Sequence, residues 1–177
     1  MKFAKSLLAL SLVALFWSCN KTTEEVNKLT EFDMSYSSES AVPATTYTAN
    51  VPVDITTPEI STNSTSRFSS ENTASNLIDE IKLTRFNITA LSGNLDFLKS
   101  FTIFIKTSAG ETQVASKTSI PAGATSVAAD LSGTNIKDHL TKDKISFRIS
   151  AIFTTGTSQE IKIKTDQTVH VKATLLN

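Results

Sequence analysis

The second half of the chain contains two pairs of segments in which apolar and polar residues alternate, and a short turn sequence joins each pair. In the clearer pair, Ile145, Phe147, Ile149 and Phe153 are separated by mainly polar residues. Alternation with a period of two is typical of a β-strand that buries one face. We therefore expect two β-hairpins, one from residues 101–107 and 111–117 and the other from residues 145–153 and 160–164.

Further segments rich in Thr, Val, Ile and Phe recur between turn residues along the rest of the chain. These candidate strands are residues 30–36, 46–55, 80–90, 125–131 and 168–175. With roughly eight strands joined mostly by short turns, the sequence predicts an all-β antiparallel sandwich. The specific expectation is an immunoglobulin-like sandwich, which rests on strand number and pattern because the Cys…Trp…Cys core of antibody domains is absent.

Two local signals refine this picture. Between residues 80 and 90 the apolar positions change parity at Thr84-Arg85, which predicts a β-bulge there. Pro43, Pro52 and Pro58 flank or interrupt the candidate strand 46–55, so we expect it to lie at a sheet edge, where a missing N–H group is harmless.

The segment from residue 57 to 76 consists largely of Ser, Thr and Asn and has little to bury. We expect an exposed loop or an extended edge whose polar side chains bond to their own backbone, or else a binding loop with Arg67 and Phe68 as contact residues. One or two short helices complete the fold, one at residues 136–141 capped by Asn135 and another near Asn76.

Composition and charge exclude several functions. Ser and Thr make up 49 of the 177 residues, which favours strands and turns over long helices. Lys and Arg number 17, the same as Asp and Glu, and no basic cluster stands out. A nucleic-acid groove needs clustered positive charge, so no nucleic-acid partner is expected.

The sequence contains few candidate catalytic residues, and we expect no enzymatic activity and no bound cofactor or metal. The one Cys rules out CxxC zinc sites, and the two His residues leave few general bases. His139 follows Asp138 in a charged segment and is expected on the surface, while His170 lies between two valines and is expected on the outer face of a strand. Asp79-Glu80 is interpreted as a strand entrance and not as an acid–base pair.

Exposed aromatic rings are the remaining candidates for ligand contact. Alternation places Phe104 on the opposite face from Phe101 and Ile103, so it points outward, and Phe68 lies in the polar segment. Either ring is a candidate contact, although a two-sheet sandwich can also cover Phe104.

The N-terminus has the organisation of a signal peptide. Lys2 and Lys5 precede an apolar run of about a dozen residues, which is too short to span a bilayer core, and Ser18 stands directly before Cys19. This arrangement resembles the lipobox of bacterial lipoproteins, in particular those of the Bacteroidota. It departs from the usual pattern at Phe16 and Trp17.

The resemblance implies cleavage before Cys19 and acylation of this residue, which then holds the protein on the membrane. Asn20 in place of Asp favours sorting to the outer membrane, on its periplasmic face or at the cell surface. The expected organisation is a signal peptide (1–18), a lipidated tether (19–28) and one β-sandwich domain (29–177). After cleavage 15 Lys and Arg remain against 17 Asp and Glu.

Two functional interpretations follow. The first is a lipid-anchored, non-enzymatic interaction module or accessory subunit of an outer-membrane complex, with an envelope protein as partner. The second is a surface protein that binds glycan or matrix. An exposed aromatic cluster including Phe104 would favour the second, and exposed aliphatic side chains would favour a protein partner.

Overall fold

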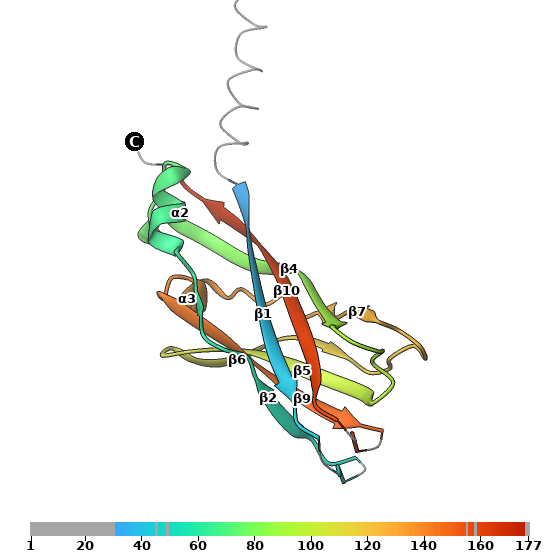
Figure 1. Cartoon of the computed structure of the whole chain (residues 1–177). Helices are drawn as coiled ribbons and strands as arrows, with labels where there is room; N and C mark the ends of the chain where they lie inside the picture. The colour runs from blue at the N-terminus through green and yellow to red at the C-terminus, as the bar shows by residue number, and fades with distance from the viewer. Residues whose placement is uncertain (1–30, 45, 49, 155, 158, 176–177) are drawn as a thin grey trace, which may run out of the picture.

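The chain forms two β-sheets with short helices at their ends (Figure 1). The computed structural model describes residues 31–44, 46–48, 50–154, 156–157 and 159–175. In the order of the chain, the elements are β1 (Glu31–Val42), β2 (Val53–Thr56), β3 (Ile60–Ser61), α2 (Ser64–Ser70), the 3₁₀ turn η1 (Ser75–Leu77), β4 (Ile78–Ala90), β5 (Leu98–Thr107), β6 (Gly110–Lys117), β7 (Ser126–Ala128), β8 (Asp130–Leu131), α3 (Lys137–Leu140), β9 (Lys144–Phe153) and β10 (Ile161–Ala173).

The strand order follows from one long hairpin folded over on itself. β1 pairs with β10, β2 with β9, β4 with β7 and β5 with β6, and every one of these pairs is antiparallel. The first sheet has the order β1-β10-β4-β7, and the second has the order β2-β9-β5-β6-β8 with β3 also on β9. Eight strands paired in this nested way form a jelly roll.

The predicted all-β antiparallel sandwich is therefore confirmed. The comparison with immunoglobulin domains holds for the two-sheet architecture but not for the strand order. In those domains the first strand shares a sheet with strands B, E and D, whereas here β1 lies beside β10, the last strand.

The core lies between the sheets and is built by alternation. Along β9 every second residue from Ile145 to Phe153 is buried, and β4, β5 and β10 show the same period over most of their length. These side chains form one continuous hydrophobic cluster. Phe86 of the first sheet meets Phe147 of the second edge to face, with ring centroids 5.2 Å apart.

Three local predictions are confirmed. The register between β4 and β10 shifts so that Leu83 faces Val169 and Arg85 faces Thr168, which leaves Thr84 as the extra residue of a bulge. β5 and β6 form the expected hairpin, and Gly110 closes its turn with a φ of 114° that favours glycine. β2 lies at an edge of the second sheet.

The second predicted hairpin is wrong. β9 pairs with β2, β3 and β5 in the second sheet, while β10 pairs with β1 and β4 in the first. The segment between them therefore crosses from one sheet to the other. Alternation indicates which face of a strand is buried. Because a strand in either sheet buries one face against the same core, alternation does not identify the strand that it pairs with.

Several strand boundaries also differ from the prediction. β10 runs unbroken from Ile161 to Ala173, where two strands were expected, and β1 continues to Val42 through a run of serines. The expected strand 46–55 shortens to β2. Serine and threonine on these strands bond across the ladder, as between Ser38 and Thr165 (2.8 Å), so polar residues continue a strand here instead of ending it.

The polar segment 57–76 is not an exposed loop. It contains α2, whose Ser64 and Phe68 are spaced one helical turn apart and are buried. Its buried hydroxyls find backbone partners, since Thr62 Oγ1 donates to the carbonyl of Lys142 and Thr73 Oγ1 donates to that of Thr174. Polar side chains can thus line the core when they are hydrogen-bonded.

The predicted short helices are present, with shifted boundaries. Asn135 precedes α3, and its Oδ1 accepts from the backbone N–H of Lys137 and from that of Ile81 in β4. Asn76 lies inside η1. The N-cap of α3 is Ile136, so the prediction of Asn135 as the cap is wrong by one residue, and Asn135 instead ties the start of the helix to the first sheet.

Candidate functional site

An arginine-centred cluster occupies the outer face of the second sheet. Arg148 of β9 lies directly opposite Phe104 of β5, and its guanidinium carbon is 4.1 Å from the centroid of that ring. Arg148 Nε and Nη2 donate to the carboxylate of Glu111 on β6, with the shortest contact at 2.9 Å. Nη1 donates to Asp54 on β2 at 3.1 Å. We call these four residues the arginine cluster.

The arginine cluster is electrostatically matched. The hydrogen bonds between Arg148 and Glu111 raise the pKa of Arg148, and the hydrogen bond to Asp54 contributes further. The bonds from Arg148 also hold the pKa of Glu111 below its usual range. The Arg148 side chain is 22% exposed. Arginine stacked on an aromatic ring and held by two carboxylates is a rigid group of the kind enriched at protein interfaces.

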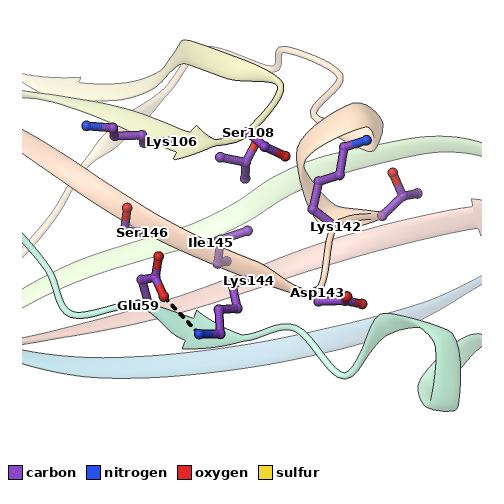
Figure 2. A pocket seen from close by; sticks show the side chains of 10 residues that line it. Glu59, Lys106, Ser108, Lys142, Asp143, Lys144, Ile145 and Ser146 are labelled. Carbon is purple, nitrogen blue, oxygen red and sulfur yellow. Dashed lines mark hydrogen bonds and ion pairs between the residues drawn. The ribbon is translucent and has the colours of Figure 1, made fainter.

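A cleft of about 530 Å³ lies at the end of the same sheet (Figure 2), and its lining residue Lys106 is paired with Glu111 of the arginine cluster in the β5–β6 ladder. Lys106, Lys142 and Lys144 line it, together with hydroxyl-bearing residues. The three amines do not converge, because Lys144 turns toward Glu59 (3.1 Å) and the other two point away from it (Figure 2). The arrangement offers separate polar contacts and not a single anion-binding centre.

His139 contacts Thr107, one of the residues that line this cleft, and the prediction that His139 is a surface residue is wrong. It is 5% exposed, with Nδ1 2.9 Å from Thr107 Oγ1 and Nε2 2.8 Å from Thr112 Oγ1. The two threonines belong to β5 and β6, so the imidazole ties α3 to the end of that hairpin. Burial lowers the pKa of His139, and the nearby charge of Asp138 opposes this.

We expect acid to weaken this tie. Because the pKa of His139 is lower in the folded chain than in the unfolded one, its contribution to stability is complete above its ordinary pKa of 6.5 and decreases as the pH falls below that value. Urea denaturation between pH 7.5 and 5 should show a falling midpoint for the wild type and a flatter profile for His139→Gln. Equal slopes for the two proteins would contradict this role.

The two aromatic contacts predicted from the sequence have different outcomes. Phe68 is fully buried and packs edge to face on Phe32, with centroids 6.1 Å apart, so its prediction as an exposed contact is wrong. Phe104 points outward as expected, but Arg148 covers one face of the ring. The third predicted contact residue, Arg67, is exposed, pairs with Glu71 at 3.0 Å and lies 5.8 Å from the ring of Phe32.

His170 lies on the outer face of the first sheet, as expected from its position. Its Nδ1 is 2.8 Å from Asp33 on the neighbouring strand, and its Nε2 is 3.4 Å from Glu31. His139 is buried at the end of the β5–β6 hairpin and His170 lies on the outer face of the first sheet, so the two do not form a common site. Cys19, the predicted lipidation site, lies outside the described residues.

Arg148 is the contact residue that sequence reasoning missed. Its outward parity was visible in the alternation of residues 145–153, but its partners come from three other strands. Within the described ranges no group of three or more His, Cys, Asp or Glu residues is placed to hold a metal ion. The described helices are all too short or too polar to cross a membrane.

Comparison with known proteins leaves the family open. No protein-family model matches the chain, and no curated protein is similar to it in sequence. Among solved structures, a decameric BFDV capsid protein is 13% identical, with a TM-score of 0.40 over 81% of this chain and 98% of that one. A Desmodium yellow mottle tymovirus chain is 11% identical, with a TM-score of 0.26 over 83% of this chain and 90% of that one.

Proposed function

We propose that this protein is a lipid-anchored, non-enzymatic module of the bacterial outer membrane that binds another envelope protein. The observation that carries the proposal is the N-terminal sequence, in which a charged start and a short apolar run end at Ser18-Cys19. The described sandwich begins at Glu31, so a short tether separates the acylated residue from the first strand. Two or more acyl chains provide stable anchoring without a membrane-spanning segment.

The arrangement of the sandwich supports such an anchor. The start of β1, α2 and the end of β10 lie at one end of the molecule, and the connections from β1 to β2 and from β9 to β10 lie at the other (Figure 1). A tether attached at Glu31 leaves the arginine cluster and the far loops free for a partner. The domain can therefore act at a distance from the bilayer.

The exposed side chains favour a protein partner over a glycan. The large hydrophobic residues that are more than a third exposed within the described ranges are Val51, Leu91 and Leu131, all of them aliphatic. Of the two aromatic rings proposed for sugar stacking, one is buried and the other is covered by Arg148. Arg148 stacked on Phe104 is the kind of contact that protein interfaces use.

Replacement of Cys19 by Ala tests the anchor. We expect the wild type to fractionate with outer membranes and to carry an acylated N-terminal Cys19 by mass spectrometry. The variant should lose acylation and either remain uncleaved or appear in the soluble fraction, because no thiol is available for the lipid. Cys19→Ser is a matched control, since it keeps the size and polarity of the side chain and should behave in the same way.

The binding part is tested separately by gentle-detergent purification of the tagged wild type from native membranes. A partner protein near equal stoichiometry supports the proposal. A Cys19→Ala protein that is still processed and lipid-bearing contradicts the anchor, and a wild type that elutes alone contradicts the binding role.

A further inference from the structure

The edges of the two sheets are protected to very different degrees. An unpaired strand edge is a template for other strands, and natural proteins protect it with short strands, Pro, Lys or bulges. β7 has three residues, β8 has two, and β2 has four with Pro52 directly before it and Pro58 shortly after it. These edges carry the usual protection.

β1 is not short and has no Pro, Lys or bulge, and its only charged side chains are acidic. This edge strand has twelve residues and pairs with β10 through twelve consecutive positions without a register shift. Its sequence from Glu31 to Val42 contains no Pro, Lys or Arg. β1 is therefore the longest and most regular edge in the described part of the chain, and it is built as a strand acceptor would be.

The register shows which backbone groups of β1 are free. The N–H of Leu91, next to β4, donates to the carbonyl of Lys162, so the backbone groups of Lys162 point toward β4. Because successive residues of a strand point their N–H and C=O groups to alternate sides, the even-numbered residues of β10 bond to β4 and the odd-numbered ones bond to β1. Odd residues of β10 face even residues of β1. The N–H and C=O groups of Asp33, Ser35 and Ser37 therefore point to the open side, where no backbone bond from another described residue reaches them.

Space for an added strand exists beside these groups. A cleft of about 570 Å³ is lined by residues 33–37 and, from outside the strand, by residues 60–63 and Arg67. Met34, Tyr36 and Ile60 supply apolar lining. A strand bonded to β1 at the usual spacing of about 4.8 Å would place every second side chain against this lining.

The outward side chains of β1 define the chemistry of the occupant. Glu31, Asp33 and Glu39 are acidic, and no residue of this strand is basic. His170 and Lys172 contact Glu31, and His170 contacts Asp33, but Lys164 opposite Glu39 pairs with Asp166 instead. A second copy of β1 would bring three more acids and no base. A strand with outward Lys or Arg is complementary.

We propose that β1 accepts an extended segment of another protein in which apolar and basic residues alternate, so that this segment continues the first sheet. This inference names the partner chemistry for the binding role proposed above and rests on that role, but it does not depend on lipid anchoring. Main-chain hydrogen bonds supply affinity in this mode of recognition, and alternate side chains supply specificity.

The probe is a fluorescent ten-residue peptide that alternates Val and Lys, with a Val and Glu peptide as its charge control, and the full chain is held in mild detergent. We expect saturable binding of the Lys peptide. Ser35→Pro removes one free N–H without removing a ladder bond, and should weaken binding by about tenfold or more. Ser35→Ala keeps the N–H and should bind like the wild type.

A second variant keeps the test independent of proline. Glu39→Lys should reverse the preference toward the Glu peptide, since Glu39 is exposed and faces outward. No saturable binding of the Lys peptide, equal binding of both peptides to the wild type, or unchanged binding to a folded Ser35→Pro protein would each overturn the proposal. A dimer that Ser35→Pro dissociates in sedimentation would also overturn it, in favour of a second copy.

Failure here and failure of the binding role are distinguishable. If a partner co-purifies with the wild type and still co-purifies with the Ser35→Pro and Glu39→Lys proteins, the protein is a binding module that uses a surface other than the β1 edge. Retention of the partner by Ser35→Ala and its loss from Ser35→Pro supports the edge.

Discussion

Replacement of Phe68 by Ala is expected to lower the free energy of unfolding by about 3 to 5 kcal/mol, the cost of deleting a large buried aromatic side chain. Phe68 is fully buried, although its neighbours on α2 are serine, threonine and arginine. It joins α2 to β1 through its contact with Phe32. Without this ring, one end of the sandwich loses its main apolar contact to the helix.

Chemical denaturation of the full chain in detergent measures this effect. Arg67→Ala is the matched control, because it removes the preceding residue of the same helix with its exposed Glu71 ion pair, and should cost only about 0 to 1 kcal/mol. If both substitutions cost the same, Phe68 does not hold the helix on the core.

The second large effect comes from a pair of single-residue deletions in β4. Deleting Thr84 should change the free energy of unfolding by about 1 kcal/mol or less, since it removes the extra residue of the bulge and one exposed hydrogen bond to the carbonyl of Thr168. The remaining residues then alternate without interruption, with Leu83 and Phe86 still facing inward.

Deleting Asn87 should instead cost about 4 kcal/mol or more, because one missing residue in a regular strand turns the following side chains to the other face. Ile88, which is 1% exposed, would move outward and Thr89 inward. The unfolding midpoints of the two deletion proteins give the comparison. A Thr84 deletion as damaging as the Asn87 deletion would show that the bulge has a structural role beyond restoring parity.

Much of the fold was predictable because its causes are local. The alternation in residues 145–153 reflects the two-residue period of a strand. The change of parity at Thr84-Arg85 is accommodated by one extra residue, and this is the bulge that β4 contains. The β5–β6 hairpin was predictable because its turn is short and Gly110 meets its backbone requirement. The outward direction of Phe104 follows from the same period.

The errors arose where a residue's environment comes from distant parts of the chain. β9 and β10 are close in sequence, yet β1 and β4 are the neighbours of β10. His139 looked exposed in a charged segment, but Thr107 and Thr112 provide partners for both ring nitrogens in the interior. Phe68 looked like part of a polar loop, because nothing near it in sequence indicates the Phe32 ring that it packs against.

Side-chain period and parity along the sequence are enough to predict an antiparallel β-sandwich, the buried face of most strands and the position of the bulge. The proposal that Cys19 is a lipid anchor rests on the sequence alone. The jelly-roll order, the contacts of Arg148 with Phe104, Glu111 and Asp54, and the open edge of β1 became visible only in the folded structure. These three features depend on which strands pair with one another, and strand pairing depends on how the complete core packs.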